Sequence, residues 1–165
     1  MADCKSALSV IGAGSYGTSL AVSVASKGLQ VTLWDRKSER VLQMQKEREN
    51  RFYLPEIKFP ESLKLTSSLK TALEDATTIL LVVPSHTFKG ILEQIVPYLT
   101  PKHRLAWATK GLDKDSGDFL SNTAKAVLPF PVPMAALSGP TFARELALGM
   151  PTAIAVAGDD QNFIS

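Results

Sequence analysis

The residues of this chain that could act on a bound ligand begin with a glycine-rich loop, Gly12-x-Gly14-x-x-Gly17. The loop lies between a short apolar run that suits a buried strand and a small-residue run that suits a closely packed helix. Gly12 allows a sharp turn out of the strand, Gly14 leaves the backbone open to a diphosphate, and Gly17 lets the helix lie close to the strand. The N–H groups and dipole of that helix would face the diphosphate. The loop therefore predicts a dinucleotide site, and a glycine turn that binds nothing is the alternative.

A second candidate is Lys110, which directly follows an expected core strand over residues 104–108 and precedes Gly111. A lysine at the carboxyl end of such a strand would lie in the cleft beside the cofactor. Its ammonium group could bind a phosphate, or donate a hydrogen bond to a carbonyl or hydroxyl that reacts with hydride. An ordinary surface lysine in a loop is the competing interpretation. The position at a strand end favours the functional one.

A third candidate is the turn Ser138-Gly139-Pro140-Thr141, which joins an expected strand to an expected helix. Thr141 suits the N-cap of that helix, and Gly139 could let an anionic ligand approach the helix N-terminus. Helix capping alone would explain the same residues. Tyr16, inside the glycine loop, could either cover the dinucleotide or pack against its neighbours.

The type of dinucleotide depends on Asp35, Arg36 and Lys37, which follow the second expected strand. Asp35 lies near the place where such folds position an acid on the adenosine ribose, and a carboxylate there disfavours a 2′-phosphate. Arg36 argues the other way, because a guanidinium pairs with phosphate and stacks on adenine. The sequence leaves NAD and NADP open and leans towards NADP through Arg36, with a solvated turn as the alternative for both basic residues.

The elements that must position these residues alternate between strands and helices. Strands are expected over residues 7–11, 30–34, 63–66, 78–83, 104–108, 134–137 and 152–157, and helices over 18–27, 38–49, 67–74, 86–96, 119–127 and 142–148. This order predicts an α/β fold with a doubly wound, mainly parallel sheet, that is, a Rossmann-like dinucleotide-binding domain over residues 1–165. Ligands bind outside the carboxyl ends of the strands in such sheets. The stretch 52–55 would form a flap over the cofactor or an apolar loop clamp.

Composition excludes several other classes. A net charge of +2, with both signs scattered along the chain, is no nucleic-acid footprint. No apolar stretch reaches the ~20 residues that cross a bilayer, and the N-terminus lacks a signal-peptide layout, so we expect a cytoplasmic protein without a membrane partner. The single cysteine, Cys4, excludes an internal disulfide, and its place near the terminus argues against catalysis. His86 and His103 lack partners at metal-ligand spacing, and His103 is expected to be solvated in its turn.

Taken together, the motifs resemble the bacterial NAD(P)-dependent sn-glycerol-3-phosphate dehydrogenases over nearly the whole chain. They occur in this order: Gly-Ala-Gly-Ser15-Tyr16-Gly-Thr, Leu33-Trp34-x-Arg36, Asn50-x-x-Tyr53-Leu54-Pro55, Val83-Pro84-Ser85, Thr109-Lys110-Gly111-Leu112, Leu137-Ser138-Gly139-Pro140-Thr141-Phe142-Ala143-x-Glu145 and Pro151-Thr152-Ala153. The resemblance implies reversible hydride transfer between dihydroxyacetone phosphate and sn-glycerol 3-phosphate, which feeds glycerophospholipid synthesis.

The resemblance also implies roles for particular residues. Lys110 would contact both cofactor and substrate and serve in catalysis, and Gly139 and Thr141 would bind the substrate. With the residues of the glycine loop and the flap included, the expected cofactor-binding set is Gly12, Gly14, Ser15, Tyr16, Gly17, Arg36, Tyr53, Lys110 and Ala143.

The family continues into a helical C-terminal domain that carries the general acid/base lysine, which would lie beyond residue 165. We therefore expect this chain to be a fragment that binds cofactor without turnover, and a homodimer is one assembly open to the complete protein. Another two-domain dehydrogenase, of the 6-phosphogluconate or hydroxyacid type, is a rival interpretation. A non-catalytic NAD(P)-sensing module is a second rival, and it would have no use for Lys110.

Overall fold

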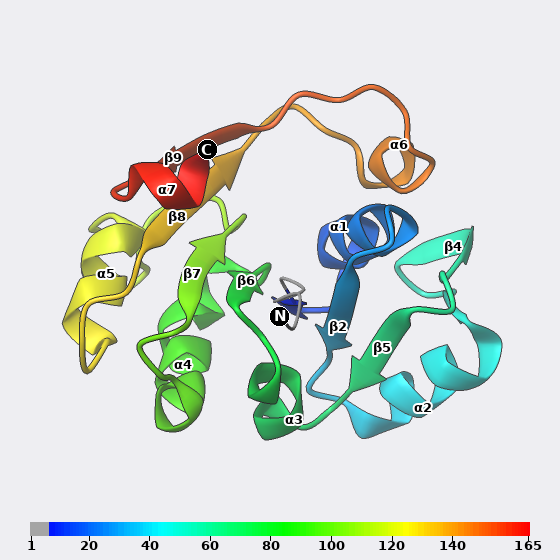
Figure 1. Cartoon of the computed structure of the whole chain (residues 1–165), viewed down its shortest axis with the longest axis horizontal. Helices are drawn as coiled ribbons and strands as arrows, with labels where there is room; N and C mark the ends of the chain where they lie inside the picture. The colour runs from blue at the N-terminus through cyan, green and yellow to red at the C-terminus, as the bar shows by residue number, and fades with distance from the viewer. Residues whose placement is uncertain (1–6) are drawn as a thin grey trace, which may run out of the picture.

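Seven strands form one sheet in the computed structural model, which describes residues 7–165 (Figure 1). The strands are β1 (Ala7–Ile11), β2 (Gln30–Trp34), β5 (Leu63–Thr66), β6 (Thr78–Leu81), β7 (Arg104–Trp107), β8 (Met134–Ser138) and β9 (Ala155–Gly158). Their order across the sheet is β5-β2-β1-β6-β7-β8-β9, and every neighbouring pair is parallel except β8 and β9. The expected doubly wound, mainly parallel sheet is confirmed. Cys4 lies outside the described residues.

Helices cover both faces of the sheet. They are α1 (Ser15–Ser26), α2 (Ser38–Glu47), α3 (Leu69–Glu74), α4 (Ser85–Ile95), α5 (Leu120–Val127), α6 (Ala143–Ala147) and α7 (Gln161–Ile164), with a 3₁₀ turn, η1 (Val96–Tyr98), after α4. The apolar residues of α1, α2, α6 and α7 belong to one core, and those of α3, α4 and α5 belong to the other. Figure 1 shows α1 and α6 side by side on their face of the sheet.

The central strands are apolar on both sides because each of them separates the two cores. Val10 and Leu80 point into the core under α1, whereas Ile11 and Leu81 point into the core under α4. Successive side chains of a strand face opposite ways, so a continuous apolar run is what a strand covered on both faces requires.

The order of the strands reverses direction at β1, since β2 and β5 continue to one side of it and β6 to the other. The crevice between the carboxyl ends of β1 and β6 is therefore the switch point at which such folds bind ligands. The glycine loop, residues 12–17, follows β1 there, and residues 82–84 follow β6.

Two features differ from the expectations. Residues 49–58 form a small antiparallel hairpin, β3 (Glu49–Asn50) with β4 (Leu54–Lys58), where a helix end and a loop were expected. The last strand is antiparallel and begins at Ala155, three residues later than expected. Among residues 7–165, no helix has the length and apolarity to cross a bilayer.

The expectation of a solvated His103 is wrong. The residue is 2% exposed, its Nδ1 accepts from the backbone N–H of Thr100 at 2.9 Å, and its Nε2 lies 3.2 Å from the carbonyl oxygen of Leu73. His103 therefore joins the turn before β7 to the end of α3.

Candidate functional site

The three glycines of the loop have different surroundings. Gly12 has φ +118°, and a Cβ there would collide with the carbonyl oxygen of Val82. A Cβ at Gly17 would collide with the carbonyl oxygen of Gly12, so the loop and α1 pack backbone to backbone. A Cβ at Gly14, in contrast, would meet no atom within 4 Å. Gly12 and Gly17 are needed for folding, whereas Gly14 leaves open space in front of the loop.

That open space lies at the N-terminus of α1. Gly14 occupies the N-cap position of α1, and no side chain caps the helix. The first N–H groups of a twelve-residue helix are thus left to an incoming ligand, and the helix dipole favours an anion at this end.

A cleft of about 430 Å³ brings most of the predicted site together. It is lined by Gly14, Ser15, Tyr16, Gly17, Val82, Val83, Pro84, Ala108, Thr109, Lys110, Thr141, Phe142 and Ala143. Residues that follow β1, β6, β7 and β8 thus meet at one edge of the sheet, as the strand-end argument requires. Gly12, Arg36, Tyr53 and Gly139, which were also predicted for the site, do not line this cleft.

Lys110 reaches the cleft because the backbone turns sharply after β7. The hydroxyl of Thr109 donates to the carbonyl oxygen of Val83 at 2.8 Å, which fixes the end of β7 to the segment after β6. Gly111, with φ +101°, then turns the chain away. Among residues 7–165 the exposed Lys110 ammonium takes part in no ion pair. This ammonium could pair with a bound anion or donate a hydrogen bond to a bound carbonyl.

Tyr16 and Thr141 contact each other across the cleft. Their hydroxyl oxygens lie 2.8 Å apart, and both residues are partly buried. The expected N-cap role of Thr141 is wrong, because Phe142 occupies the N-cap position of α6 and no side chain caps that helix. The Thr141 side chain instead joins the turn after β8 to the glycine loop.

Close backbone packing explains why position 139 is a glycine. A Cβ at this position would lie 2.5 Å from the carbonyl oxygen of Ala153. The turn after β8 therefore packs directly against the chain that leads into β9, and the substrate role of Gly139 stays a prediction.

Asp35 is buried at the end of β2, and its side chain is only 4% exposed. Its carboxylate accepts from both Nη2 and Nε of Arg40 and from the backbone N–H of Lys37. Arg36, the next residue, is exposed. The acid expected at the ribose is thus already bound within the protein, whereas the neighbouring cation is open to solvent.

The β3–β4 hairpin carries Tyr53 beside this region. Buried Asn50 anchors the hairpin to the glycine loop, since its Nδ2 donates to the Ala13 carbonyl at 3.0 Å and to the Thr18 hydroxyl at 2.9 Å. Its Oδ1 accepts from the N–H of Tyr53 at 3.3 Å. Asn50 was not among the residues predicted for the site, and its only sequence signal was its place in the Asn50-x-x-Tyr53 motif.

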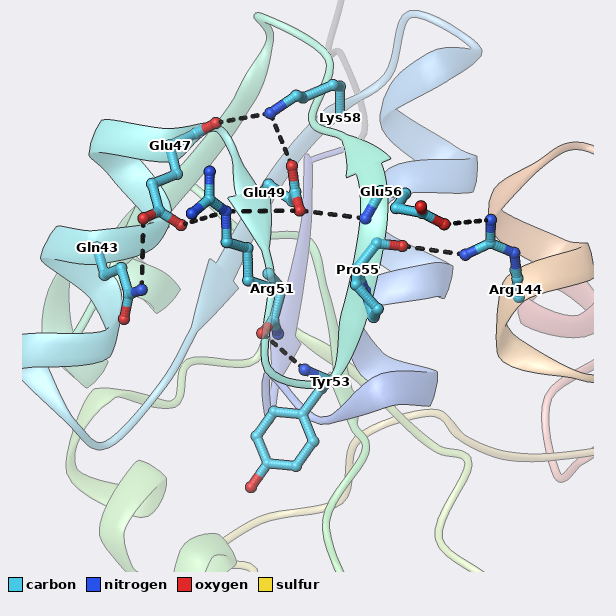
Figure 2. Close-up of polar contacts among 10 residues, drawn as sticks. Gln43, Glu47, Glu49, Arg51, Tyr53, Pro55, Glu56, Lys58 and Arg144 are labelled. Atoms are coloured by element: carbon cyan, nitrogen blue, oxygen red, sulfur yellow. Dashed lines mark hydrogen bonds and ion pairs between the residues drawn. The ribbon is translucent and has the colours of Figure 1, made fainter.

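Ion pairs hold the other end of the hairpin (Figure 2). Lys58 bonds the Glu49 carboxylate at 2.7 Å, and Arg144 of α6 bonds the Glu56 carboxylate at 2.9 Å and the Pro55 carbonyl at 3.1 Å. The Lys58 hydrogen bond, together with the Glu56 N–H, lowers the pKa of Glu49 below its ordinary value. The hairpin is thereby tied to α6 as well as to the glycine loop.

In the part of the chain that the structure describes, no group of three or more His, Cys, Asp or Glu side chains could hold a metal ion.

Comparison with known proteins gives a consistent set of matches. The family model described as "NAD-dependent glycerol-3-phosphate dehydrogenase N-terminus" matches residues 7–164. Glycerol-3-phosphate dehydrogenase [NAD(P)+] of Tolumonas auensis is 50% identical over 163 residues, which is 99% of this chain and 49% of that protein. The enzyme of the same name from Aeromonas hydrophila is 48% identical over 99% of this chain and 48% of that protein.

A solved structure agrees with these matches. The crystal structure of glycerol-3-phosphate dehydrogenase from Coxiella burnetii superposes with a TM-score of 0.92 at 43% identity, covering 97% of this chain and 49% of that one. The chain spans about half the length of the curated relatives it matches.

Proposed function

The chain belongs to the family of NAD-dependent glycerol-3-phosphate dehydrogenase N-terminal domains, and on this premise we propose that it is the dinucleotide-binding half of such an oxidoreductase. The proposed reaction transfers a hydride between NAD(P)H and dihydroxyacetone phosphate and gives sn-glycerol 3-phosphate for glycerophospholipid synthesis. A helical C-terminal domain would complete the active site. A cytoplasmic location and a homodimer stay predictions.

One observation supports this proposal above the others. A single cleft holds the open backbone of Gly14, the Lys110 ammonium, which has no ion-pair partner among residues 7–165, and the Tyr16–Thr141 hydroxyl pair. A dinucleotide-sensing module needs only the first of these. The cation and the hydroxyl pair are suited to a second, phosphorylated ligand with a carbonyl group.

Each group has a distinct task in the proposed reaction. The bound nicotinamide cofactor supplies or accepts the hydride. The backbone at Gly14 and the N-terminus of α1 hold its diphosphate. The Lys110 ammonium donates a hydrogen bond to the substrate and stabilises negative charge that develops on the carbonyl oxygen. Thr141, and Gly139 beside it, orient the substrate on the glycine-loop side. The proton comes from the general acid that we place in the C-terminal domain.

The experiment joins this chain to the C-terminal half of the Tolumonas auensis relative and follows oxidation of NADH or NADPH with dihydroxyacetone phosphate. We expect the 165-residue chain alone to bind reduced cofactor without turnover, and the chimera to catalyse the reduction. Lys110→Ala in the chimera should lower kcat/KM by about 10²–10³-fold, the range for losing one preorganised hydrogen-bond donor.

Lys102→Ala is the matched control, because Lys102 is an exposed lysine at the amino end of β7, away from the cleft. It should leave kcat/KM unchanged. Undiminished turnover by Lys110→Ala would exclude the catalytic assignment. Substrate reduction by the isolated chain would exclude the division of the active site between two halves. A folded chimera that prefers a 6-phosphogluconate or hydroxyacid substrate would favour the rival dehydrogenases.

A further inference from the structure

Asp35 stands where a dinucleotide fold places the acid that accepts from the adenosine ribose, yet its carboxylate already accepts hydrogen bonds from Arg40 and Lys37. Arg40 Nη2 lies 2.7 Å from Oδ2 and 2.9 Å from Oδ1, Arg40 Nε lies 3.3 Å from Oδ1, and the N–H of Lys37 donates to Oδ1 at 2.8 Å. A two-pronged guanidinium–carboxylate pair is among the strongest side-chain contacts. Ribose hydroxyls would have to compete with these donors for a carboxylate that is 4% exposed.

Arg40 is itself fixed on its other side. Its guanidinium carbon lies 5.1 Å from the centre of the Tyr53 ring, within the range of a cation–π contact. The side chain is 28% exposed, so Arg40 lies between the buried acid and the aromatic residue at the turn of the hairpin. The pair Asp35–Arg40 is thus a preformed unit.

The charges that remain open on this turn are positive. Arg36 and Lys37 are both exposed and carry no ion pair among the described residues. Helix α2 begins directly after them at Ser38, and no side chain caps it. Since Arg40 neutralises Asp35, a group placed beside Arg36 is attracted by two cations and a helix N-terminus, and the exposed Glu39 carboxylate in the first turn of α2 opposes them.

Resting on the proposed function, we propose that Arg40 is a specificity-determining positioning residue: by holding the Asp35 carboxylate, it makes the turn after β2 accept the 2′-phosphate of NADP(H). Arg40 acts through Asp35 and does not itself bind the phosphate. Specificity here comes from removal of a repulsive charge, and Arg36 supplies the attraction.

The test measures dissociation constants of NADPH and NADH for the 165-residue chain by the fluorescence of the reduced nicotinamide. The wild-type chain should bind NADPH more tightly. Arg40→Leu exposes an unpaired carboxylate, so it should lower the preference for NADPH over NADH by about tenfold or more, mostly through weaker NADPH binding. Asp35→Asn leaves the Arg40 charge unpaired, so it should keep or raise the preference for NADPH.

The double variant Asp35→Asn/Arg40→Leu separates this role from a merely structural one. It lacks both charges and should recover most of the NADPH preference that Arg40→Leu loses. Arg104 is exposed and lies at the amino end of β7, whereas the turn after β2 lies at the carboxyl ends of the strands. Arg104→Leu is therefore the control for loss of one positive charge. It should leave the preference unchanged.

The outcomes are distinguishable. If the folded chain binds neither cofactor, the proposed function fails and this inference fails with it. If both cofactors bind but Arg40→Leu does not shift their ratio, only the role of Arg40 is excluded. If Arg40→Leu does not fold, Asp35→Asn decides, since a carboxylate that binds the ribose would lose more than about tenfold in NADH affinity when replaced. A wild-type preference for NADH also overturns the inference.

Discussion

The hydroxyl oxygens of Tyr16 and Thr141 lie 2.8 Å apart, although 125 residues separate them in the chain. Tyr16 is in the first turn of α1, and Thr141 lies two residues before α6. The two helices pack side by side on one face of the sheet (Figure 1). The contact therefore joins the loop proposed to bind the cofactor to the turn proposed to bind the substrate.

The first prediction measures this contact by a double-mutant cycle. Tyr16→Phe and Thr141→Val each remove one hydroxyl, and each should lower the free energy of unfolding by about 0.5–1.5 kcal/mol. Because both variants break the same bond, the double variant should be destabilised less than the sum, with a coupling of about 1 kcal/mol. Urea unfolding measures all four proteins. Strict additivity would mean that the hydroxyls do not interact.

The second prediction separates the two kinds of glycine in the loop. Gly17→Ala places a Cβ against the Gly12 carbonyl, so it should destabilise the chain by about 1–3 kcal/mol or more and weaken cofactor binding. Gly14→Ala meets no atom, and its φ of −74° is accessible to alanine. It should preserve stability, or raise it by about 0.4–1 kcal/mol, while its methyl group occupies the space proposed for the diphosphate.

Thermal unfolding and NADPH titration of both variants provide the comparison. The expected pattern is loss of stability and binding in Gly17→Ala but loss of binding alone in Gly14→Ala. Unimpaired NADPH binding by Gly14→Ala would contradict the placement of the diphosphate in front of the glycine loop.

Much of the fold could be predicted because it depends on local patterns. Apolar runs such as residues 7–11 and 78–81 are typical of strands buried on both faces, and the alternation with helices specified a doubly wound sheet. The glycine loop could be interpreted residue by residue, since the need for each glycine is a matter of backbone sterics.

The features that could not be predicted depend on partners distant in the chain or on side-chain competition. His103 is in a turn of polar residues, and its burial follows from the position of α3 beside that turn. Asp35 carries a sequence signal for ribose binding, but Arg40, in the first turn of α2, binds its carboxylate instead. Asn50 reaches Ala13 and Thr18 only after the hairpin has folded onto α1.

The third prediction concerns pH. Burial, with nearby Lys102, lowers the pKa of His103 below its ordinary value of 6.5, although its bond to the Leu73 carbonyl opposes the shift. The unfolded chain therefore takes up a proton at a higher pH than the folded chain does. Stability from neutral His103 is fully present above 6.5 and is lost as the pH falls through 6.5 towards the lowered pKa.

His103→Gln should remove this dependence, because an amide retains hydrogen-bonding groups but does not titrate. Its unfolding free energy should fall less steeply than that of the wild type as the pH is lowered through 6.5. Replacement of the exposed His86 by Gln is the matched control and should keep the wild-type profile. Equal slopes in the wild type and His103→Gln would show that His103 does not carry the effect.

The fourth prediction tests whether the hairpin positions the glycine loop through Asn50 or through its surface ion pair. Asn50→Ala leaves the buried Ala13 carbonyl and Thr18 hydroxyl without this donor, so it should cost about 1–3 kcal/mol of unfolding free energy and weaken NADPH binding. Arg144→Ala removes the ion pair with Glu56. The Arg144 and Glu56 side chains are 52% and 78% exposed, so this loss should lower the free energy of unfolding by less than about 1 kcal/mol. Urea unfolding and NADPH titration compare the two variants, and a larger loss in Arg144→Ala would mean that the connection to α6 holds the hairpin in place.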